Sequence, residues 1–197
     1  MMPPRLSPDE RSLLLELARE TIATRLREGR MPAVGGDYLP PRLAEPAACF
    51  VTLTKDGALR GCMGTLEPRW PLYRAVMENA AKAAFGDPRF PPVTLEELPE
   101  LHIEISVLSP VRVLPARTPE EKLAALEPGR HGVILRARGL TATYLPQVWE
   151  KLPDKELFLA SLSRKAGLDP AAWRSPEAIL AVYEVESFEE PEPGGLV

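Results

Sequence analysis

The chain has 197 residues, of which 45% are hydrophobic and 6% aromatic, and 24 basic against 28 acidic side chains give a net charge of −4. This length suits one domain, or two small subdomains that share a core. The excess of acidic residues and the lack of a Lys/Arg run mean that the sequence lacks the basic patch by which proteins bind duplex nucleic acid or an anionic membrane. No stretch approaches the roughly 20 apolar residues that a membrane helix needs.

Cysteine usage and the N-terminal sequence both predict a reduced, cytoplasmic protein. Two cysteines, Cys49 and Cys62, are too few for a disulfide framework, although one disulfide between them is compatible with the sequence. No apolar segment of the kind found in signal peptides precedes the first predicted helix. One Asn and one Gln stand against 23 prolines, a composition typical of thermophilic proteins that a GC-rich genome would also produce.

Helices alternate with strands along the chain. The first helix begins at a capping box formed by Ser7 and Glu10, with Pro8 at its first position, and it ends at Gly29. In chain order we predict a helix over residues 8–28, a hairpin over 47–66 with an Asp-Gly turn, a helix over 71–85, strands over 101–109 and 111–114, a helix after residue 118, a hairpin over 133–145, a helix between 154 and 167, and a strand over 178–188. This order predicts an α+β protein with antiparallel sheets and packed helices.

The stretch LRGCMGTL, residues 59–66, places one thiol between two glycines. Gly61 and Gly64 flank Cys62 in a segment that otherwise has the pattern of a strand. Glycine weakens a strand unless a backbone or a ligand must come close, or unless the chain bulges there. The pattern therefore suits an exposed thiol or a ligand-contacting loop. A buried structural cysteine beside two turn glycines is the other interpretation.

A stiff, proline-rich loop follows the second predicted helix, at residues 87–92. Its Asp87 can accept backbone hydrogen bonds, as aspartate does in turns. Arg89 can pair with Asp87, or it can present its donors to an anionic ligand. The sequence leaves both alternatives open.

The strand over residues 101–109 has the clearest alternation in the chain. Its apolar side chains alternate with polar ones, so His102, Glu104 and Ser106 share one face at intervals of about 6.5–7 Å. A solvated face explains this pattern. The alternative is the floor of a cleft, in which Glu104 acts as a general base and Ser106 as a hydrogen-bond partner.

His131 lies between two glycines, Gly129 and Gly132, before the second predicted hairpin. A histidine in such a position is usually a surface or turn residue. The same position also suits a proton carrier or a ligand donor, because the pKa of histidine lies near neutral pH.

Several common site motifs are missing. The chain has no GxGxxG, no P-loop, no GxSxG, no CxxC and no HExxH. Two histidines and two cysteines make a structural zinc site improbable, and we predict neither a metal nor a cofactor. Cys62 is then the one nucleophile candidate with a suggestive setting, because a catalytic thiolate needs a nearby cation and Arg60 is two residues away.

The string LRGCMGTL resembles the LRGC(I/M)GT signature of the AMMECR-one domain family. Further blocks resemble the family in the same order at residues 50–54, 87–93, 102–109, 129–133, 145–148 and 165–173. The resemblance thus covers most of the chain. It implies one AMMECR-one domain over residues 1–197, built of two α+β subdomains with a cleft between them. We place the subdomain boundary near residue 111 and an acidic, flexible tail over residues 189–197.

The resemblance also implies a functional context. Stand-alone prokaryotic members of this family, of the kind called component A of the Amme-Memo-radical-SAM system, are encoded beside a Memo-like protein and a radical-SAM protein. We therefore expect an enzyme, or an enzyme component, that acts on a small molecule in the cleft. Cys62 would be the nucleophile or ligand-contacting thiol, and Glu104 or His131 would move protons. Arg60 and Arg89 would bind an anionic group. The expected ligand-binding residues are Arg60, Gly61, Gly64, Thr65, Asp87, Arg89 and Ser106.

Two alternatives remain open. The chain could be a non-catalytic binding module for a protein partner or an RNA-like ligand, with the stretch over residues 59–66 as backbone architecture and with an inert, buried Cys62. The net negative charge argues against the nucleic-acid form of this idea. A redox sensor that uses the same thiol is a third, weaker alternative.

Overall fold

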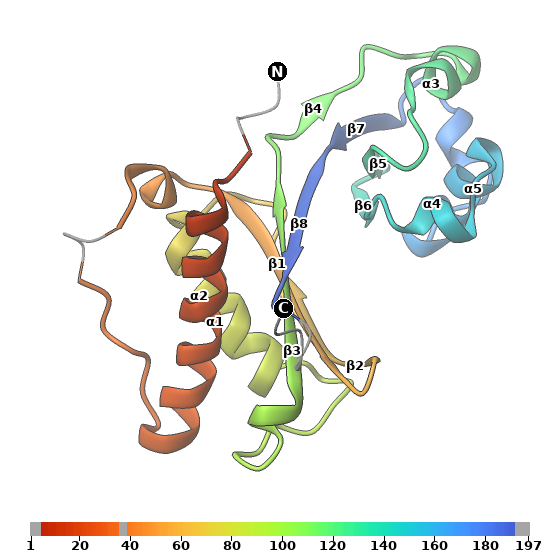
Figure 1. The fold of residues 1–197 in the computed structure, drawn as a ribbon. Coiled ribbons are helices and arrows are strands. Elements are labelled where there is room, and N and C mark those ends of the chain that lie inside the picture. The colour runs from red at the N-terminus through yellow and green to blue at the C-terminus, as the bar shows by residue number, and fades with distance from the viewer. Residues whose placement is uncertain (1–4, 36–38, 192–197) are drawn as a thin grey trace. The chain divides into compact units, whose positions relative to one another are not determined.

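The structure is a computed structural model that describes residues 5–35 and 39–191 (Figure 1). The predicted α+β class is confirmed, because these residues form two four-stranded antiparallel sheets and five α-helices. The strand orders are β2-β1-β3-β8 and β4-β7-β5-β6. The chain divides into two compact units. We call Ser109–Val185 the second unit, and the described residues before and after that segment the first unit.

The first unit contains two long helices and the sheet β2-β1-β3-β8. Its elements are α1 (Pro8–Glu28), β1 (Ala48–Lys55), β2 (Ala58–Gly64), α2 (Leu72–Phe85), β3 (Leu101–Leu108) and β8 (Val185–Glu189), with 3-10 turns at Pro41–Ala44 and Leu98–Glu100. Both α1 and α2 pack on one face of this sheet, as Figure 1 shows. Their buried side chains and those of β1 and β3 form one apolar core.

Helix α1 confirms the local prediction at both of its ends. The Ser7 hydroxyl accepts from the backbone N–H of Glu10, the Glu10 carboxylate accepts in turn from the N–H of Ser7, and Gly29 has the left-handed φ of 70° that ends the helix. Such caps depend on residues a few positions apart, so the sequence alone predicts them well.

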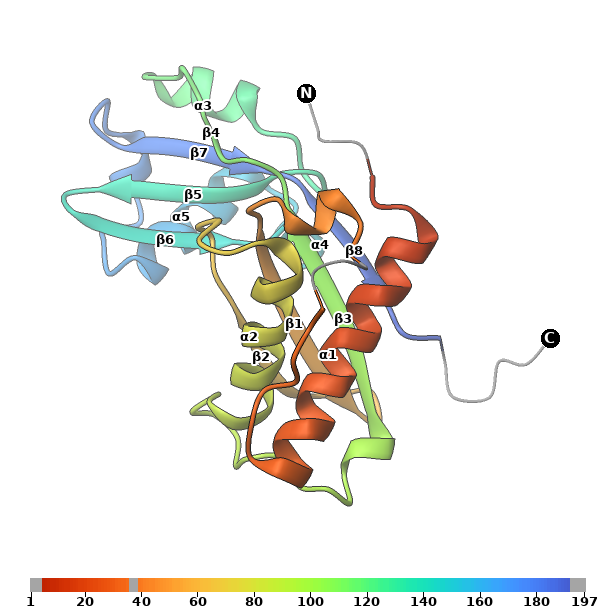
Figure 2. The same ribbon diagram turned by 90° about the vertical axis from the view of Figure 1, so that its left-hand side faces the viewer.

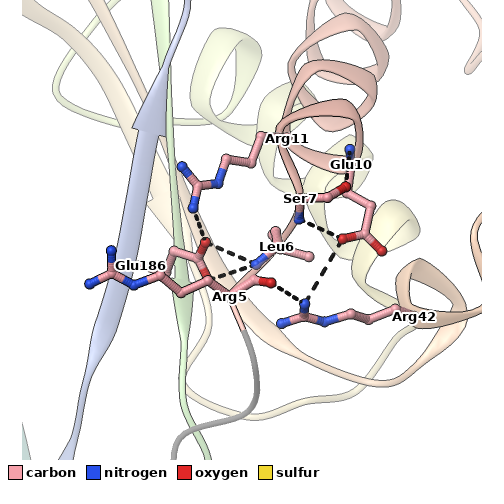
Figure 3. A network of polar contacts seen from close by, with 7 residues as sticks. All are labelled: Arg5, Leu6, Ser7, Glu10, Arg11, Arg42 and Glu186. Carbon is pink, nitrogen blue, oxygen red and sulfur yellow. Dashed lines mark hydrogen bonds and ion pairs between the residues drawn. The ribbon is translucent and has the colours of Figure 1, made fainter.

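The start of α1 is also tied to the last strand of the sheet (Figure 3). The Glu186 carboxylate of β8 accepts a hydrogen bond of 3.0 Å from the backbone N–H of Leu6 and one of 2.8 Å from the Arg11 guanidinium. Arg42 donates to the carbonyl oxygen of Arg5 at 2.6 Å. The bond between Leu6 and Glu186 joins residues that are 180 positions apart in the sequence.

The first hairpin has the predicted turn, and its register sets the faces of the sheet. Asp56 and Gly57 both have positive φ, 52° and 74°, as a type I′ turn requires. Thr52 of β1 lies opposite Cys62 of β2 and opposite Glu104 of β3. Side chains alternate along each strand, so the neighbours of Thr52 in β1 point to the helices while Thr52 points to the other face.

The second unit packs its sheet against shorter helices. Its elements are β4 (Arg112–Val113), α3 (Pro119–Ala125), β5 (Gly132–Ala137), β6 (Leu140–Tyr144), α4 (Val148–Lys151), α5 (Lys155–Lys165), a 3-10 turn at Ala172–Arg174 and β7 (Ile179–Tyr183). Strands β7, β5 and β6 lie side by side in Figure 2. The Trp149 and Phe158 rings stack at 3.6 Å in the core of this unit.

One prediction of an element was wrong. The strand predicted over residues 178–188 is two strands, β7 and β8, which belong to different sheets. Between them, the N–H of Ser109 donates to the carbonyl oxygen of Glu184, and the N–H of Glu184 donates to the Ser109 hydroxyl, both at 2.9 Å. The chain therefore passes between the units twice, after Leu108 and after Val185, whereas the sequence suggested one boundary near residue 111.

The first two residues of the predicted tail, Glu189 and Glu190, belong to the folded part of the first unit. Glu189 is the last residue of β8, and the Glu190 carboxylate pairs with the Arg19 guanidinium of α1 at 2.5 Å. Residues 192–197, the remainder of the predicted tail, lie outside the described residues.

Candidate functional site

The face of the first sheet that points away from α1 and α2 is polar. Cys62, Thr52 and Glu104 form one row across β2, β1 and β3, because Thr52 is the register partner of both others. The Thr52 hydroxyl donates to the Cys62 sulfur at 3.4 Å. We call this surface the polar face, and its polar members are Thr52, Thr54, Cys62, His102, Glu104, Ser106, Ser187 and Glu189.

Hydrogen bonds order the β3 and β8 side of the polar face. The buried Ser106 hydroxyl donates to Glu104 Oε1 at 3.2 Å and lies 2.8 Å from the Ser187 hydroxyl. His102 Nε2 lies 3.3 Å from Glu189 Oε2. The structure thus brings Glu104 and Ser106 into contact, as their spacing in the strand predicts, and adds Ser187, which sequence reasoning missed.

The backbone of Cys62 is bound by the loop that follows α2. Cys62 N–H donates to Asp87 Oδ2 at 2.9 Å, and the Arg89 guanidinium donates to the carbonyl oxygen of Cys62 at 3.4 Å. Strand β2 is an edge strand, so these two side chains satisfy groups that a neighbouring strand would otherwise bind. The loop residues therefore position the thiol-bearing residue.

Asp87 and Arg89 pair with each other. Arg89 Nε and Nη2 donate to the two carboxylate oxygens at 2.9 and 2.6 Å, and the Asp87 side chain is only 2% exposed. Arg89, together with the backbone N–H groups of Cys62 and Arg89 itself, holds the pKa of Asp87 well below its usual range. Of the two alternatives that the sequence left open for Arg89, the structure displays the pairing with Asp87.

Arg60 is committed to internal partners. Its Nε and Nη2 donate to the two carboxylate oxygens of Glu97 at 2.9 Å each, and its Nη1 donates to the carbonyl oxygen of Pro91 at 2.9 Å. The Arg60 side chain is 12% exposed, and its hydrogen bonds lower the pKa of Glu97 to about 2. Arg60 therefore ties β2 to the segment before β3.

The glycines of the motif permit close packing within the first unit. A Cβ atom on Gly61 would lie 2.2 Å from the carbonyl oxygen of Ala83 in α2, and one on Gly64 would lie 2.4 Å from the Phe50 ring. The groups that come close to the two glycines are therefore other residues of the first unit. Thr65 likewise has a local role, because its N–H donates to the carbonyl oxygen of Cys49 at 3.1 Å.

The two cysteines have different surroundings. Cys49 points to the helices and is fully buried, whereas Cys62 lies on the polar face and is partly exposed, and both are free thiols. Burial raises the pKa of Cys49 to about 11. Asn79 of α2 donates to the carbonyl oxygen of Cys49 at 3.0 Å. This buried amide is a further residue that sequence reasoning missed.

His131 belongs to the second unit and is not part of the polar face. It is buried, its Nδ1 accepts from the N–H of Glu127 at 3.1 Å, and its carbonyl oxygen accepts from Trp149 Nε1 at 2.7 Å. Burial lowers the pKa of His131. Gly132 beside it lies against the Tyr183 ring, which a Cβ atom would approach to 2.4 Å. His131 is therefore buried within the second unit and hydrogen-bonded there through its ring and its backbone.

The described residues place no group of three or more His, Cys, Asp or Glu side chains where a metal ion could bind. No helix among them is long and apolar enough to cross a membrane.

The protein is thus of the α+β class, with two compact units that are each built on a four-stranded antiparallel sheet. One of the sheets carries a glycine-flanked thiol on its polar face. The family model AMMECR1 matches residues 15–188, so the chain belongs to the AMMECR1 family, and the resemblance read from its motifs is confirmed.

Proteins with similar sequences are found in archaea. Protein MK0488 of Methanopyrus kandleri is 43% identical, over 98% of this chain and 94% of that protein. Protein PF1979 of Pyrococcus furiosus is 38% identical, again over 98% and 94%. The crystal structure of the uncharacterized protein PH0010 from Pyrococcus horikoshii superposes with a TM-score of 0.87 at 36% identity, over 97% of this chain and 96% of that one. This chain is therefore similar to these proteins over nearly its whole length.

Proposed function

We propose that the protein is an enzyme, or an enzyme component, that acts on a small molecule bound on the polar face, with Cys62 as its key residue. The observation that carries this proposal is the row formed by Cys62, Thr52 and Glu104. It combines a thiol, a hydroxyl and a carboxylate on one surface, and these are the groups from which nucleophilic and acid–base sites are built.

In this proposal each member of the row has a role. Cys62 is the nucleophile or the group that contacts the ligand, and the Thr52 hydroxyl, which donates to its sulfur at 3.4 Å, orients it. Glu104 lies on the far side of Thr52, so it exchanges protons with the ligand rather than with the thiol. The site expected in a cleft between subdomains, and the expected Memo-like and radical-SAM partners, stay predictions.

Native-state alkylation tests the proposal. We expect iodoacetamide to modify Cys62 in the folded protein and to leave Cys49 intact until the protein is unfolded, with both sites read by mass spectrometry. Fractions of a small-molecule extract are then added before the reagent, and a fraction that contains the ligand slows the alkylation of Cys62. A Cys62 that stays unmodified in the folded protein, or that no fraction protects, would contradict the proposal.

A non-catalytic binding module is the second candidate, and a specific observation favours it. Gly61, Gly64 and Arg60 all have packing partners within the first unit, so the motif around Cys62 has a structural explanation that needs no reaction. This alternative predicts an inert Cys62, and it leads if the alkylation experiment fails. Pull-down of a Memo-like or radical-SAM protein equally by the wild type and by Cys62→Ala would also favour it.

A further inference from the structure

We infer that the ligand of the polar face carries an amino or guanidino group that binds Glu104, while another part of the same molecule reaches Cys62. This inference rests on the proposed function, because it takes the polar face as the binding surface. It differs from the expectation, drawn from the sequence, of an anionic group held by Arg60 and Arg89.

The first argument is that the positive charges near Cys62 are already balanced. Both oxygens of Glu97 accept from Arg60 at 2.9 Å, and both oxygens of Asp87 accept from Arg89 at 2.9 and 2.6 Å. A bidentate carboxylate is the strongest partner that an arginine commonly finds in proteins. An anionic ligand would have to displace or compete with these internal carboxylates.

The second argument is that the unbalanced charge on the polar face is negative. Glu189 Oε2 lies 3.3 Å from His102 Nε2, whereas the hydrogen bond assigned to the Glu104 side chain within the described residues comes from the Ser106 hydroxyl. Glu104 Oε1 accepts from Ser106, and among the residues that the structure describes no hydrogen bond is assigned to Oε2. An ionised carboxylate can only accept hydrogen bonds, so a ligand that binds it has to supply donors, as an ammonium or guanidinium group does.

The third argument concerns size. Cys62 and Glu104 are the register partners of Thr52 on its two sides. One antiparallel pair separates Cα atoms by about 4.5–5.5 Å, so the two Cα atoms lie about 10 Å apart. A molecule with the dimensions of an amino acid or a diamine spans this distance between the thiol and the carboxylate.

A pair of thiol reagents that differ in charge tests the inference directly. The cationic 2-aminoethyl and the anionic 2-sulfonatoethyl methanethiosulfonates react alike: the thiolate attacks the reagent sulfur, a mixed disulfide forms and methanesulfinate leaves. Each rate at Cys62 is divided by the rate with a short, unstructured peptide that contains one cysteine. At low ionic strength, the charge of Glu104 should raise the rate of the cationic reagent at Cys62, about 10 Å away, by about twofold. It should lower the rate of the anionic reagent by about the same factor, so the ratio of the cationic to the anionic rate should be about four.

Two variants and a salt series complete the test. The isosteric Glu104→Gln variant should bring the ratio close to one. The matched control Glu16→Gln, an exposed position on α1 and thus on the other side of the sheet, should leave the ratio unchanged. In the wild type, raising the salt concentration to about 1 M should also lower the ratio towards one, because the Debye length falls to about 3 Å.

The outcomes separate this inference from the function on which it rests. A wild-type ratio at or below one, or a ratio that Glu104→Gln leaves unchanged, overturns the inference even when neutral iodoacetamide modifies Cys62 normally. If iodoacetamide itself fails to modify Cys62 in the folded protein, the proposed function is overturned and the inference with it.

Discussion

Cys62 donates its backbone N–H to the carboxylate of Asp87 across 2.9 Å, although 25 residues separate them in the sequence. The same carboxylate is held by Arg89, which also donates to the carbonyl oxygen of Cys62. The outer edge of β2 is therefore closed at the thiol-bearing residue by two side chains instead of a fifth strand. This arrangement explains physically why an Asp-Pro-Arg loop accompanies the cysteine motif in this chain.

Asp87→Asn should destabilise the protein and should loosen β2 at Cys62. The variant keeps the shape of the side chain but loses the charge that pairs with Arg89. The pKa of Asp87 is lowered in the folded state, so its contribution is present above the ordinary pKa of about 3.9 and is lost as the pH falls below that value. Urea unfolding should show a gap between wild type and variant at pH 7 that shrinks at pH 3. Hydrogen exchange at Cys62 should be faster in the variant, and equal exchange would contradict the role given to Asp87.

Gly61→Ala should lower the free energy of unfolding by about 3 kcal/mol, because the new methyl group meets backbone that cannot move aside easily. Its Cβ atom would lie 2.2 Å from the carbonyl oxygen of Ala83. Gly35→Ala is the matched control, since a Cβ atom there meets nothing within 4 Å, and it should change the free energy by less than about 1 kcal/mol. Similar urea midpoints for the two variants would show that α2 does not constrain the motif.

His131→Ala should cost about 1–3 kcal/mol of stability, because the N–H of Glu127 loses its acceptor, and it should leave the alkylation of Cys62 unchanged. The pKa of His131 is lowered by burial, so the unfolded chain binds the proton more readily and wild-type stability should fall as the pH drops below about 6.5. His131→Asn, which retains an acceptor and does not titrate, should lose this pH dependence. A slower reaction of Cys62 in either variant would restore a functional role for His131.

Lys122→Ala should destabilise the second unit more than Lys122→Met. The fully buried Nζ donates to the carbonyl oxygens of Trp173 and Ser175 at 3.0 and 2.6 Å. Either substitution leaves these carbonyls unpaired, at about 1–3 kcal/mol each, and alanine adds a cavity. Burial lowers the pKa of Lys122, so the wild type should gain stability relative to Lys122→Met as the pH rises towards about 10.4. Thermal unfolding from pH 7 to 10 checks the sign.

The sequence predicted the features that depend on near neighbours. The capping box at Ser7 and the turn at residues 56–57 are set by residues a few positions apart, so their types and spacing suffice. The alternation in β3 likewise placed Glu104 and Ser106 on one face, and the hydrogen bond between them agrees with that placement.

The features that the sequence could not predict depend on contacts between distant segments. Arg60 finds its partner Glu97 only when the segment before β3 is folded against β2. The carbonyl oxygen of Ala83 leaves no room for a side chain at Gly61 only when α2 is packed on β2. Residues 178–188 contain no glycine or proline that would mark a turn, so no strong local signal indicates that the strand changes sheets there. Thr52 was missed for the same reason, because its importance comes from the two strands beside it.

The hydrogen bonds between Ser109 and Glu184 bring the two ends of the second unit together. Ser109–Val185 is therefore an insertion in the connection between two neighbouring strands. Without it, β3 and β8 would form a hairpin. Joining Ser109 to Val185 through a short turn would restore a simple hairpin and would leave every member of the polar face in the host. Domain insertions whose ends adjoin are well tolerated, so we expect changes within the second unit of this chain to leave the thiol row in place.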